Sequence, residues 1–370
     1  MTKAEKLRFW GLIGFSVLIR LIFLSRPSEP VFDELGYLPY LQQFLSGKPE
    51  FIPHPPLGVA VLSWGVKLLG DSPLGWRIFP ALLGALGVGL TYLLARRITK
   101  NSQSAFYAAF LLAFSFLWFT VSRIAMLDIT LTVLLLGAVL AALKKRYCFA
   151  ALLGGLALAV KWTALPALIL LYAFIIREFL RSQEKNRLSY LQILFLPLLT
   201  AGIYLGVFAL FYRNFHLSQL LVYQKVLWDF QTGLSPDKTY ATPAWSWYLL
   251  PQAIPCFGEN APAFKQIFLM ENPALLWWGV LSLIWAGLEI LKKQKTFLTL
   301  PWLLWLSLYL PFFFTTHPGY LHYLIPTLPW LYLISGEALH KTFGDSFWSR
   351  VYLGFIALSF LAFYPWMVIK

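Results

Sequence analysis

The sequence predicts an all-α integral membrane protein with about eleven transmembrane helices. Three observations indicate this fold class. Hydrophobic residues make up 59% of the 370 residues and charged residues only 12%, whereas a soluble domain carries about 25% charged residues. Long apolar runs such as 131–143 show no alternation of polar and apolar residues. The basic residues gather in every second loop between such runs, as they do in multi-pass membrane proteins.

The apolar runs define the individual spans, because a helix needs about 20 residues to cross a bilayer. Arg20 interrupts the first run and no small-residue cleavage site follows it, so that run is expected to be an anchor and not a signal peptide. The stretch 57–69 is too short to cross and is expected to form an interfacial or re-entrant helix. The predicted spans are 9–24, 75–95, 104–121, 125–143, 147–161, 163–180, 190–212, 273–291, 297–314, 320–339 and 350–369.

The positive-inside rule orients these spans. Short loops on one side carry tight basic clusters, which places the N-terminus in the cytoplasm and, with an odd number of spans, the C-terminus outside. The net charge of +14 is therefore a topology signal with some contact to anionic lipid heads, and no nucleic-acid partner is expected. The clusters are Lys3/Lys6/Arg8, Arg96/Arg97/Lys100, Lys144/Lys145/Arg146, Arg177/Arg181/Lys185/Arg187, Lys292/Lys293/Lys295 and Lys341/Arg350.

Two long loops remain on the external face, 25–74 and 213–272, and both are rich in Pro, Trp and Tyr. We therefore expect chemistry or recognition on this face. The chain divides into an N-terminal transmembrane module, 1–212, whose first external loop carries the catalytic residues, an external loop, 213–272, and a C-terminal module of four helices, 273–370.

Two adjacent carboxylates, Asp33 and Glu34, open the first external loop just beyond a span. A carboxylate that is half-shielded from water is more basic and can take a proton from an incoming hydroxyl. The structural alternative is an Asp that caps a short helix with Glu34 in its first turn. Further along, the prolines of Pro53-His54-Pro55-Pro56 hold His54 rigidly before the interfacial helix. The plain alternative is a stiff loop whose histidine merely bonds a neighbour.

Four more ionisable residues lie at predicted external helix ends: Arg77, Arg123, Asp128 and Lys161. Charges at that depth usually face a cavity or one another, and the cations there suit a lipid phosphate. The structural alternatives are snorkelling cations and an ion pair between Asp128 and Arg123. The five histidines are scattered, and no nucleotide-binding motif is present. We expect no metal and no other cofactor.

Several blocks in order along nearly the whole chain resemble the protein O-mannosyltransferase family (glycosyltransferase family 39). They begin with Phe32-Asp33-Glu34, His54-Pro55-Pro56-Leu57-Gly58 and Arg77 before Pro80, and continue through Arg123, Asp128 and Val160-Lys161-Trp162-Thr163. The C-terminal blocks are Ala241-Thr242-Pro243-Ala244-Trp245-Ser246-Trp247, Asn272-Pro273 and His322-Tyr323-Leu324-Ile325-Pro326.

The resemblance implies a GT-C glycosyltransferase fold, with the active site on the external face. It also implies a polyprenyl-phosphate-mannose donor, Ser/Thr hydroxyls of translocated proteins as acceptors, and inversion at the anomeric carbon. Asp33 is then the candidate base, and Glu34 supports the acceptor or the loop geometry. Lys161, Arg123 and Arg77 are the candidates for the phosphate. Asp128, His54, His322 and Tyr323 complete the candidate substrate-binding residues.

The loop 213–272 is too short for the β-trefoil domain that the eukaryotic members carry, which indicates a compact bacterial-type member in a plasma membrane. The same donor chemistry also fits transfer to a lipid or glycan, as in the aminoarabinose transferases that act on lipid A. A polytopic transporter or flippase is the alternative from another class. It is disfavoured because its polar residues belong near the bilayer midplane, whereas these lie at helix ends.

Overall fold

The computed structural model describes residues 1–47, 53–181, 187–212, 217–233, 240–258, 266–293, 296–314 and 319–368. Lys185 and Lys295 of the basic clusters lie outside this part of the chain. The described residues form helices and one small sheet of two antiparallel strands. The first half of the chain contains α1 (Lys3–Leu21), α2 (Glu34–Leu45), α3 (Leu57–Leu69), α4 (Pro73–Thr99), α5 (Ser102–Ala113), α6 (Phe116–Val121), α7 (Asp128–Leu143), α8 (Tyr147–Leu158), η1 (Trp162–Ala164) and α9 (Leu165–Arg181).

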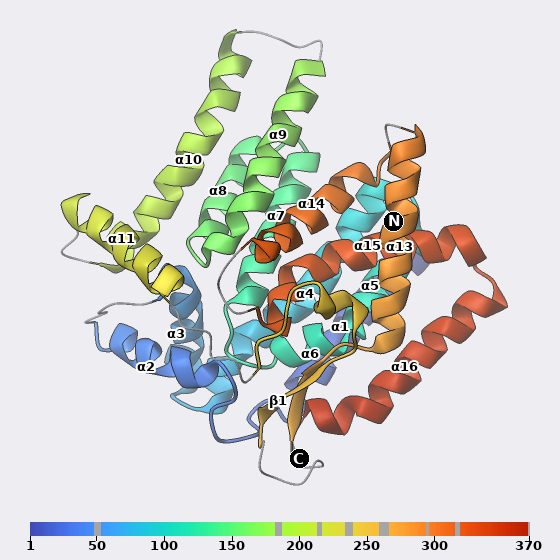
Figure 1. The fold of residues 1–370 in the computed structure, drawn as a ribbon, viewed down its shortest axis with the longest axis horizontal. Coiled ribbons are helices and arrows are strands. Elements are labelled where there is room, and N and C mark those ends of the chain that lie inside the picture. The colour runs from blue at the N-terminus through green and yellow to red at the C-terminus, as the bar shows by residue number, and fades with distance from the viewer. Residues whose placement is uncertain are drawn as a thin grey trace.

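The second half adds longer outer helices and the hairpin, whose strands pair Ala253 with Met270 and Pro255 with Phe268. In Figure 1, α9 and α10 run side by side at one edge, and α13 and α16 lie at the opposite edge. Its elements are α10 (Arg187–Phe211), α11 (Leu217–Gly233), α12 (Ser246–Leu249), β1 (Ala253–Phe257), β2 (Ile267–Met270), α13 (Pro273–Lys293), α14 (Thr299–Tyr309), η3 (Leu310–Phe313), η4 (Leu321–Thr327), α15 (Leu328–Phe343) and α16 (Phe347–Met367).

Each predicted span coincides with helix, and five helices among the described residues are long and apolar enough to cross a membrane. These are α4, the continuous segment Trp162–Arg181, α10, α13 and α16. Shorter apolar helices include α3, α7 and α8. The outer helices expose large apolar side chains such as Leu194, Leu198, Leu281 and Leu358, as lipid-facing surfaces do. The prediction of a helical multi-pass membrane protein is confirmed in this form.

One predicted span, 104–121, is divided into α5 and α6. Ser115 lies in extended conformation between them, and its hydroxyl accepts from the Trp118 backbone N–H to cap α6. The buried carboxylate of Glu271 accepts from the Ser115 hydroxyl and from the Phe116 backbone N–H. A residue distant in sequence therefore accepts a hydrogen bond from a backbone N–H at the start of α6. The apolar run alone does not indicate this second helix start.

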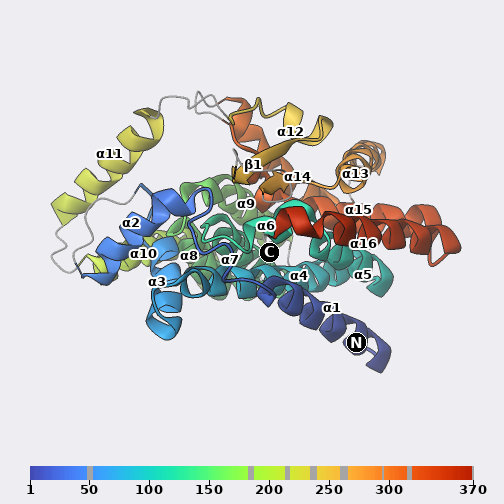
Figure 2. The same cartoon turned by 90° about the horizontal axis from the view of Figure 1, so that it is seen from below.

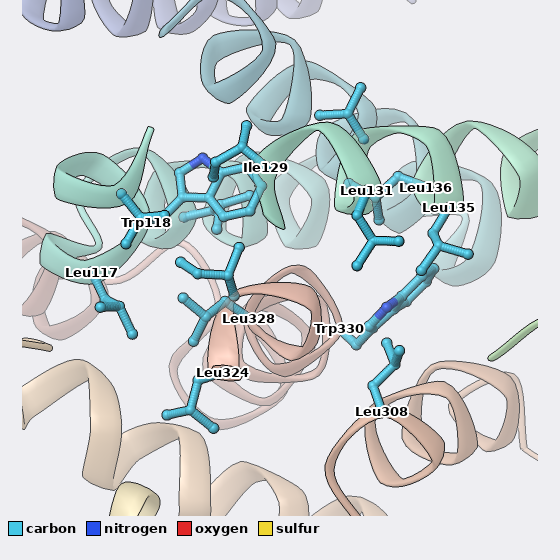
Figure 3. Close-up of a cluster of buried hydrophobic side chains, with 14 of the residues drawn as sticks. Leu117, Trp118, Ile129, Leu131, Leu135, Leu136, Leu308, Leu324, Leu328 and Trp330 are labelled. Carbon is cyan, nitrogen blue, oxygen red and sulfur yellow. The ribbon is translucent and has the colours of Figure 1, made fainter. Parts of the chain in front are cut away.

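The core lies between α4, α5, α7 and α15. In Figure 3, Ile129 and Leu131 of α7 and Trp118 of α6 lie around Leu328 and Trp330 of α15. The indole of Trp118 is fully buried and donates to the Gly84 carbonyl of α4. These contacts join the helices whose ends carry the candidate functional residues, so the packing of the core and the geometry of that site are coupled.

Glycine allows the closest helix approaches in this core, as expected for membrane helices. A Cβ on Gly336 of α15 would lie 2.5 Å from the Ala108 backbone nitrogen of α5. In α4, a Cβ on Gly87 would lie 2.4 Å from the Trp118 ring of α6, so this glycine too permits a close approach.

Gly336→Ala is expected to destabilise the protein, because the added methyl group meets backbone and forces the two helices apart. Overpacking of this kind costs about 1–3 kcal/mol, which a thermal unfolding measurement in detergent will detect. The matched control is Gly354→Ala in α16, where a Cβ meets no atom within 4 Å. An unchanged unfolding temperature for Gly336→Ala would contradict the close packing of α5 on α15.

Candidate active site

The acidic pair lies at the start of α2, with Asp33 as its N-cap residue and Glu34 in its first turn. The Asp33 side chain makes no capping hydrogen bond, so the expected alternative of a simple helix cap does not describe it. Phe32 before it has a φ of 52°, a left-handed conformation that is sparsely populated for a bulky residue. The Phe32 ring packs edge-on against the ring of His322 with centroids 5.3 Å apart.

The Asp33 carboxylate remains accessible within a crowded surrounding. Its side chain keeps 31% of its surface exposed, and its Oδ2 lies 3.8 Å from Nε2 of His322. Desolvation by the surrounding protein raises the pKa of Asp33 above its usual value, against the opposing effects of His322 and Lys161. A partly exposed carboxylate with a raised pKa is suited to accept a proton.

Glu34 is in the opposite situation, since its side chain is completely buried and fully engaged. It forms a two-pronged ion pair with Arg77 of α4, at 2.8 Å to Nε and 2.7 Å to Nη2. Its oxygens also accept from the backbone N–H groups of Val31 and Ala125, each at 2.8 Å. Glu34 therefore joins the loop, α4 and the segment before α7, and it leaves Asp33 as the member of the pair that can meet a substrate.

The guanidinium groups of Arg77 and Arg123 donate hydrogen bonds to groups of the protein itself. Arg77 also donates to the carbonyls of Leu24, Pro27 and Glu29. Arg123 donates to the carbonyls of Ile19, Arg20, Ile22 and Phe23, which are the last of α1 and the residues just after it. Such carbonyls have no partner within their own helix. The two arginines thus hold the chain that leads from α1 into the acidic loop.

Lys161 and Asp128 form a buried ion pair near Asp33. The Lys161 Nζ lies 3.0 Å and 3.3 Å from the two Asp128 oxygens, so Asp128 pairs with Lys161 and not with Arg123 as the alternative expected. The same Nζ lies 5.3 Å from the ring centroid of Tyr323, a cation–π contact. Asp33 interacts electrostatically with both members of the pair.

Backbone contacts of the proline-rich segment explain how His54 reaches this group. The Leu57 N–H donates to the Ala159 carbonyl, two residues before Lys161. Gly58 packs so closely on the start of α7 that a Cβ would lie 2.7 Å from the Leu127 side chain. His54 packs on Tyr37 with ring centroids 6.0 Å apart and interacts electrostatically with Asp128.

The structure therefore brings six of the predicted residues into one group, whereas Glu34, Arg77 and Arg123 lie in the framework beneath it. Two aromatic residues of this group, Tyr37 and Tyr320, were not predicted from the sequence. Tyr37 follows Asp33 by one helical turn and is buried, and Tyr320 stacks on His322. The i+4 spacing from Asp33 would have indicated Tyr37. The six residues are Asp33, His54, Asp128, Lys161, His322 and Tyr323.

Within the described ranges, no group of three or more His, Cys, Asp or Glu side chains is arranged to hold a metal ion. The described site is made of a partly exposed carboxylate beside a histidine, a lysine–aspartate pair and aromatic rings. These groups can bind a polar amphiphile, hold a phosphate beside an ammonium group and move one proton.

Comparison with known proteins supports the resemblance seen in the sequence. Residues 53–205 match the family described as dolichyl-phosphate-mannose-protein mannosyltransferase. A polyprenol-phosphate-mannose–protein mannosyltransferase of Mycobacterium tuberculosis is 31% identical over 148 residues, which are 36% of this chain and 28% of that protein. A Corynebacterium glutamicum protein of the same name is 30% identical over 152 residues, 36% of this chain and 29% of that protein. The chain thus covers under a third of each relative's length.

Solved structures show the fold. The yeast protein O-mannosyltransferase Pmt1-Pmt2 complex bound to the sugar donor matches with a TM-score of 0.89 at 14% identity, over 99% of this chain and 90% of that chain. ArnT from Cupriavidus metallidurans bound to undecaprenyl phosphate matches with a TM-score of 0.67 at 14% identity, over 96% of this chain and 64% of that chain. The expected GT-C architecture is confirmed at this level.

Proposed function

We propose that this chain, whose residues 53–205 match the dolichyl-phosphate-mannose-protein mannosyltransferase family, is an inverting glycosyltransferase. It moves mannose from a polyprenyl-phosphate donor to Ser or Thr hydroxyls of translocated proteins. The observation that carries the proposal is that the two adjacent carboxylates have different surroundings. Glu34 is buried in an ion pair with Arg77, whereas Asp33 keeps accessible oxygens beside His322.

The reaction is a single displacement. The acceptor oxygen attacks the anomeric carbon as the bond from that carbon to the phosphate oxygen breaks, and the electron pair of that bond leaves with the phosphate. Asp33 takes the proton of the acceptor hydroxyl. One base is sufficient, because a phosphate leaves as a stable anion and needs no proton from a general acid, unlike the sugar oxygen in a glycosidase.

Lys161 is the cation that we place beside the donor phosphate. An ammonium group has three N–H donors, and Asp128 takes up two of them, which leaves one for the phosphate. Asp128 then acts as a positioning residue that holds Lys161 in place. Arg77 and Arg123 were expected to bind the phosphate as well. All three nitrogens of Arg77 donate to protein groups, and both Nη groups of Arg123 donate to backbone carbonyls at the end of α1. We therefore assign both arginines to the loop framework.

Replacing Lys161 is expected to weaken donor binding more than acceptor binding. Loss of one hydrogen bond to a charged group changes binding by about ten- to a hundredfold, measured as KM for the donor at saturating acceptor. Because Lys161→Met alone strands the buried Asp128 carboxylate, the informative variant is Lys161→Met with Asp128→Leu, and Asp128→Asn is its control. Equal effects on donor and acceptor KM would argue against a phosphate contact.

The proposal places Asp33 on the external face of a bacterial plasma membrane, with about eleven spans, the N-terminus in the cytoplasm and the C-terminus outside. The basic loop clusters support this orientation. A cysteine introduced at Leu35, which is exposed next to the acidic pair, is expected to react with a membrane-impermeant reagent added to intact cells. Reaction only after the membrane is opened would reverse the orientation.

Two classes of acceptor fit the proposed reaction, because both carry a hydroxyl group. The likeness in fold to ArnT supports, as a second candidate, transfer to a lipid or glycan hydroxyl. The test is incubation of the purified protein in liposomes with radiolabelled polyprenyl-phosphate-mannose and either a Ser/Thr-rich peptide pool or a lipid and glycan extract, with and without a metal chelator. Label on peptide supports the first candidate, and label only in the extract supports the second. No transfer to either acceptor would contradict the proposed function.

A further inference from the structure

A pocket of about 1200 Å³ lies at the far end of α4, between α4, α7, α9 and α14. The helix α14 packs against α9, and Figure 1 shows the two beside each other. Arg97, which lines the pocket, follows Arg77 by 20 residues in α4. At 1.5 Å per residue the two arginines are about 30 Å apart along the helix, which is about the thickness of the hydrocarbon core. The pocket therefore opens at the membrane face opposite Asp33.

The pocket, which we call the basic pocket, is strongly positive. Arg96 pairs with Glu5 at 2.9 Å, and Arg97 donates to the Leu143 carbonyl at 3.0 Å. Within the described part of the chain, its other cations have no hydrogen-bond or ion-pair partner, and one carboxylate, Glu178, also lines the pocket. The cations without such a partner are Lys100, Lys144 and Arg177.

The remainder of the wall is apolar and comes from the same four helices. The helices α7 and α9 pack against each other, and Figure 2 shows them on the same side of the molecule as α8. At the start of α14, Thr299 has a buried hydroxyl without a hydrogen-bond partner in the described structure, and no side chain caps the helix. Backbone N–H groups at such a helix start attract anions. The apolar lining includes Leu93, Leu140, Leu170, Phe174, Leu300 and Leu303.

We propose that the basic pocket binds one anionic phospholipid of the leaflet opposite the candidate active site. Its phosphate lies among Lys100, Lys144 and Arg177, and an acyl chain lies along the apolar wall. Basic residues that merely mark topology need no apolar lining, and a water-soluble anion gains nothing from one. A phosphate that carries hydrocarbon satisfies both parts of the pocket, and basic pockets between transmembrane helices at such a face suit anionic lipid heads.

The test is a lipid-binding titration on delipidated protein in detergent, which does not depend on transferase activity. Phosphatidylglycerol is compared with phosphatidylcholine, with polyprenyl phosphate and with inorganic phosphate, by thermal shift and by native mass spectrometry. We expect one phosphatidylglycerol to bind each chain and to raise the unfolding temperature, because a ligand of the folded state stabilises it. Phosphatidylcholine and inorganic phosphate are expected to have little effect.

The informative variant is Lys144→Gln with Arg177→Gln, which is expected to weaken phosphatidylglycerol binding about 30-fold, since each cation near an anionic lipid contributes about fivefold. The matched control removes two cations outside the pocket, with Lys145→Gln and Lys292→Gln, and is expected to bind as the wild type does. The proposal would be overturned if both variants lost the same affinity or if phosphatidylcholine bound as well as phosphatidylglycerol. It would also be overturned if inorganic phosphate raised the unfolding temperature as much, or if polyprenyl phosphate bound more tightly. The wild-type lipid comparison decides it even if a variant fails to fold.

Discussion

Asp33→Asn is expected to lower turnover by about 10²–10⁴-fold, the usual loss when a general base is removed. The fold and donor binding should persist, because Asp33 makes no capping hydrogen bond and Asn has nearly the same shape. The measurement is the transfer rate at saturating donor and acceptor, with the donor Kd measured separately. Near-normal turnover in this variant would remove Asp33 from the role of base.

The pH dependence of the wild type provides a check on the same residue. Burial raises the pKa of Asp33, and a base acts only when it is deprotonated. Transfer should therefore fall as the pH drops through this raised pKa, at a higher pH than an ordinary carboxyl with its value near 3.9 would give. Leu35→Ala is a suitable control, because Leu35 is exposed beside the pair and its replacement should leave the profile unchanged.

Arg77→Met is expected to have the largest effect on stability. It would leave the Glu34 carboxylate buried without its charged partner, and breaking a buried ion pair in this way costs about 3–5 kcal/mol. We expect a lower unfolding temperature in detergent and a poor yield of monodisperse protein. The combined variant Glu34→Gln with Arg77→Met should recover part of the loss, because the Gln carbonyl still accepts from a backbone N–H and no charge is stranded.

A different result for Arg77→Met would support the initial expectation that Arg77 binds the donor phosphate. If Arg77→Met folded normally and instead raised KM for the donor, its guanidinium would be in contact with the phosphate. The ion pair with Glu34 and the three carbonyl contacts of Arg77 oppose that outcome. Lys225→Met is the matched control, since its ion pair with Asp229 is exposed and such pairs contribute little to stability.

The helical part of the fold was predictable because it depends on local patterns. Apolar runs and the basic residues between them define where helices begin and end, as for α4 with Ser72 before it and Lys100 after it. The division of one span at Ser115 was not predictable, because it depends on Glu271, more than 150 residues away. The hairpin of β1 and β2 was missed for a similar reason, since two short strands gain stability only from each other and from the core beneath.

The candidate site was predictable as a set of residues but not as a set of roles. Motif order indicated Asp33, Lys161 and His322 together, and the structure brings them together. The sequence does not show which arginine or lysine already bonds groups of the protein itself. Arg123 looked like a free charge at a helix end, yet its donors cover the last carbonyls of α1. To assign these hydrogen bonds, one must know how two segments distant in sequence lie in space.

The anomeric configuration of the transferred mannose tests the central claim most directly. If Asp33 acts alone as the base, while Glu34 is held by Arg77, the sugar in the product must have the configuration opposite to that in the donor. The measurement is NMR of the glycosylated product made by the purified protein from a donor of defined configuration. Inversion is the predicted result. Retention would require a covalent glycosyl–enzyme intermediate and would contradict the account of this site.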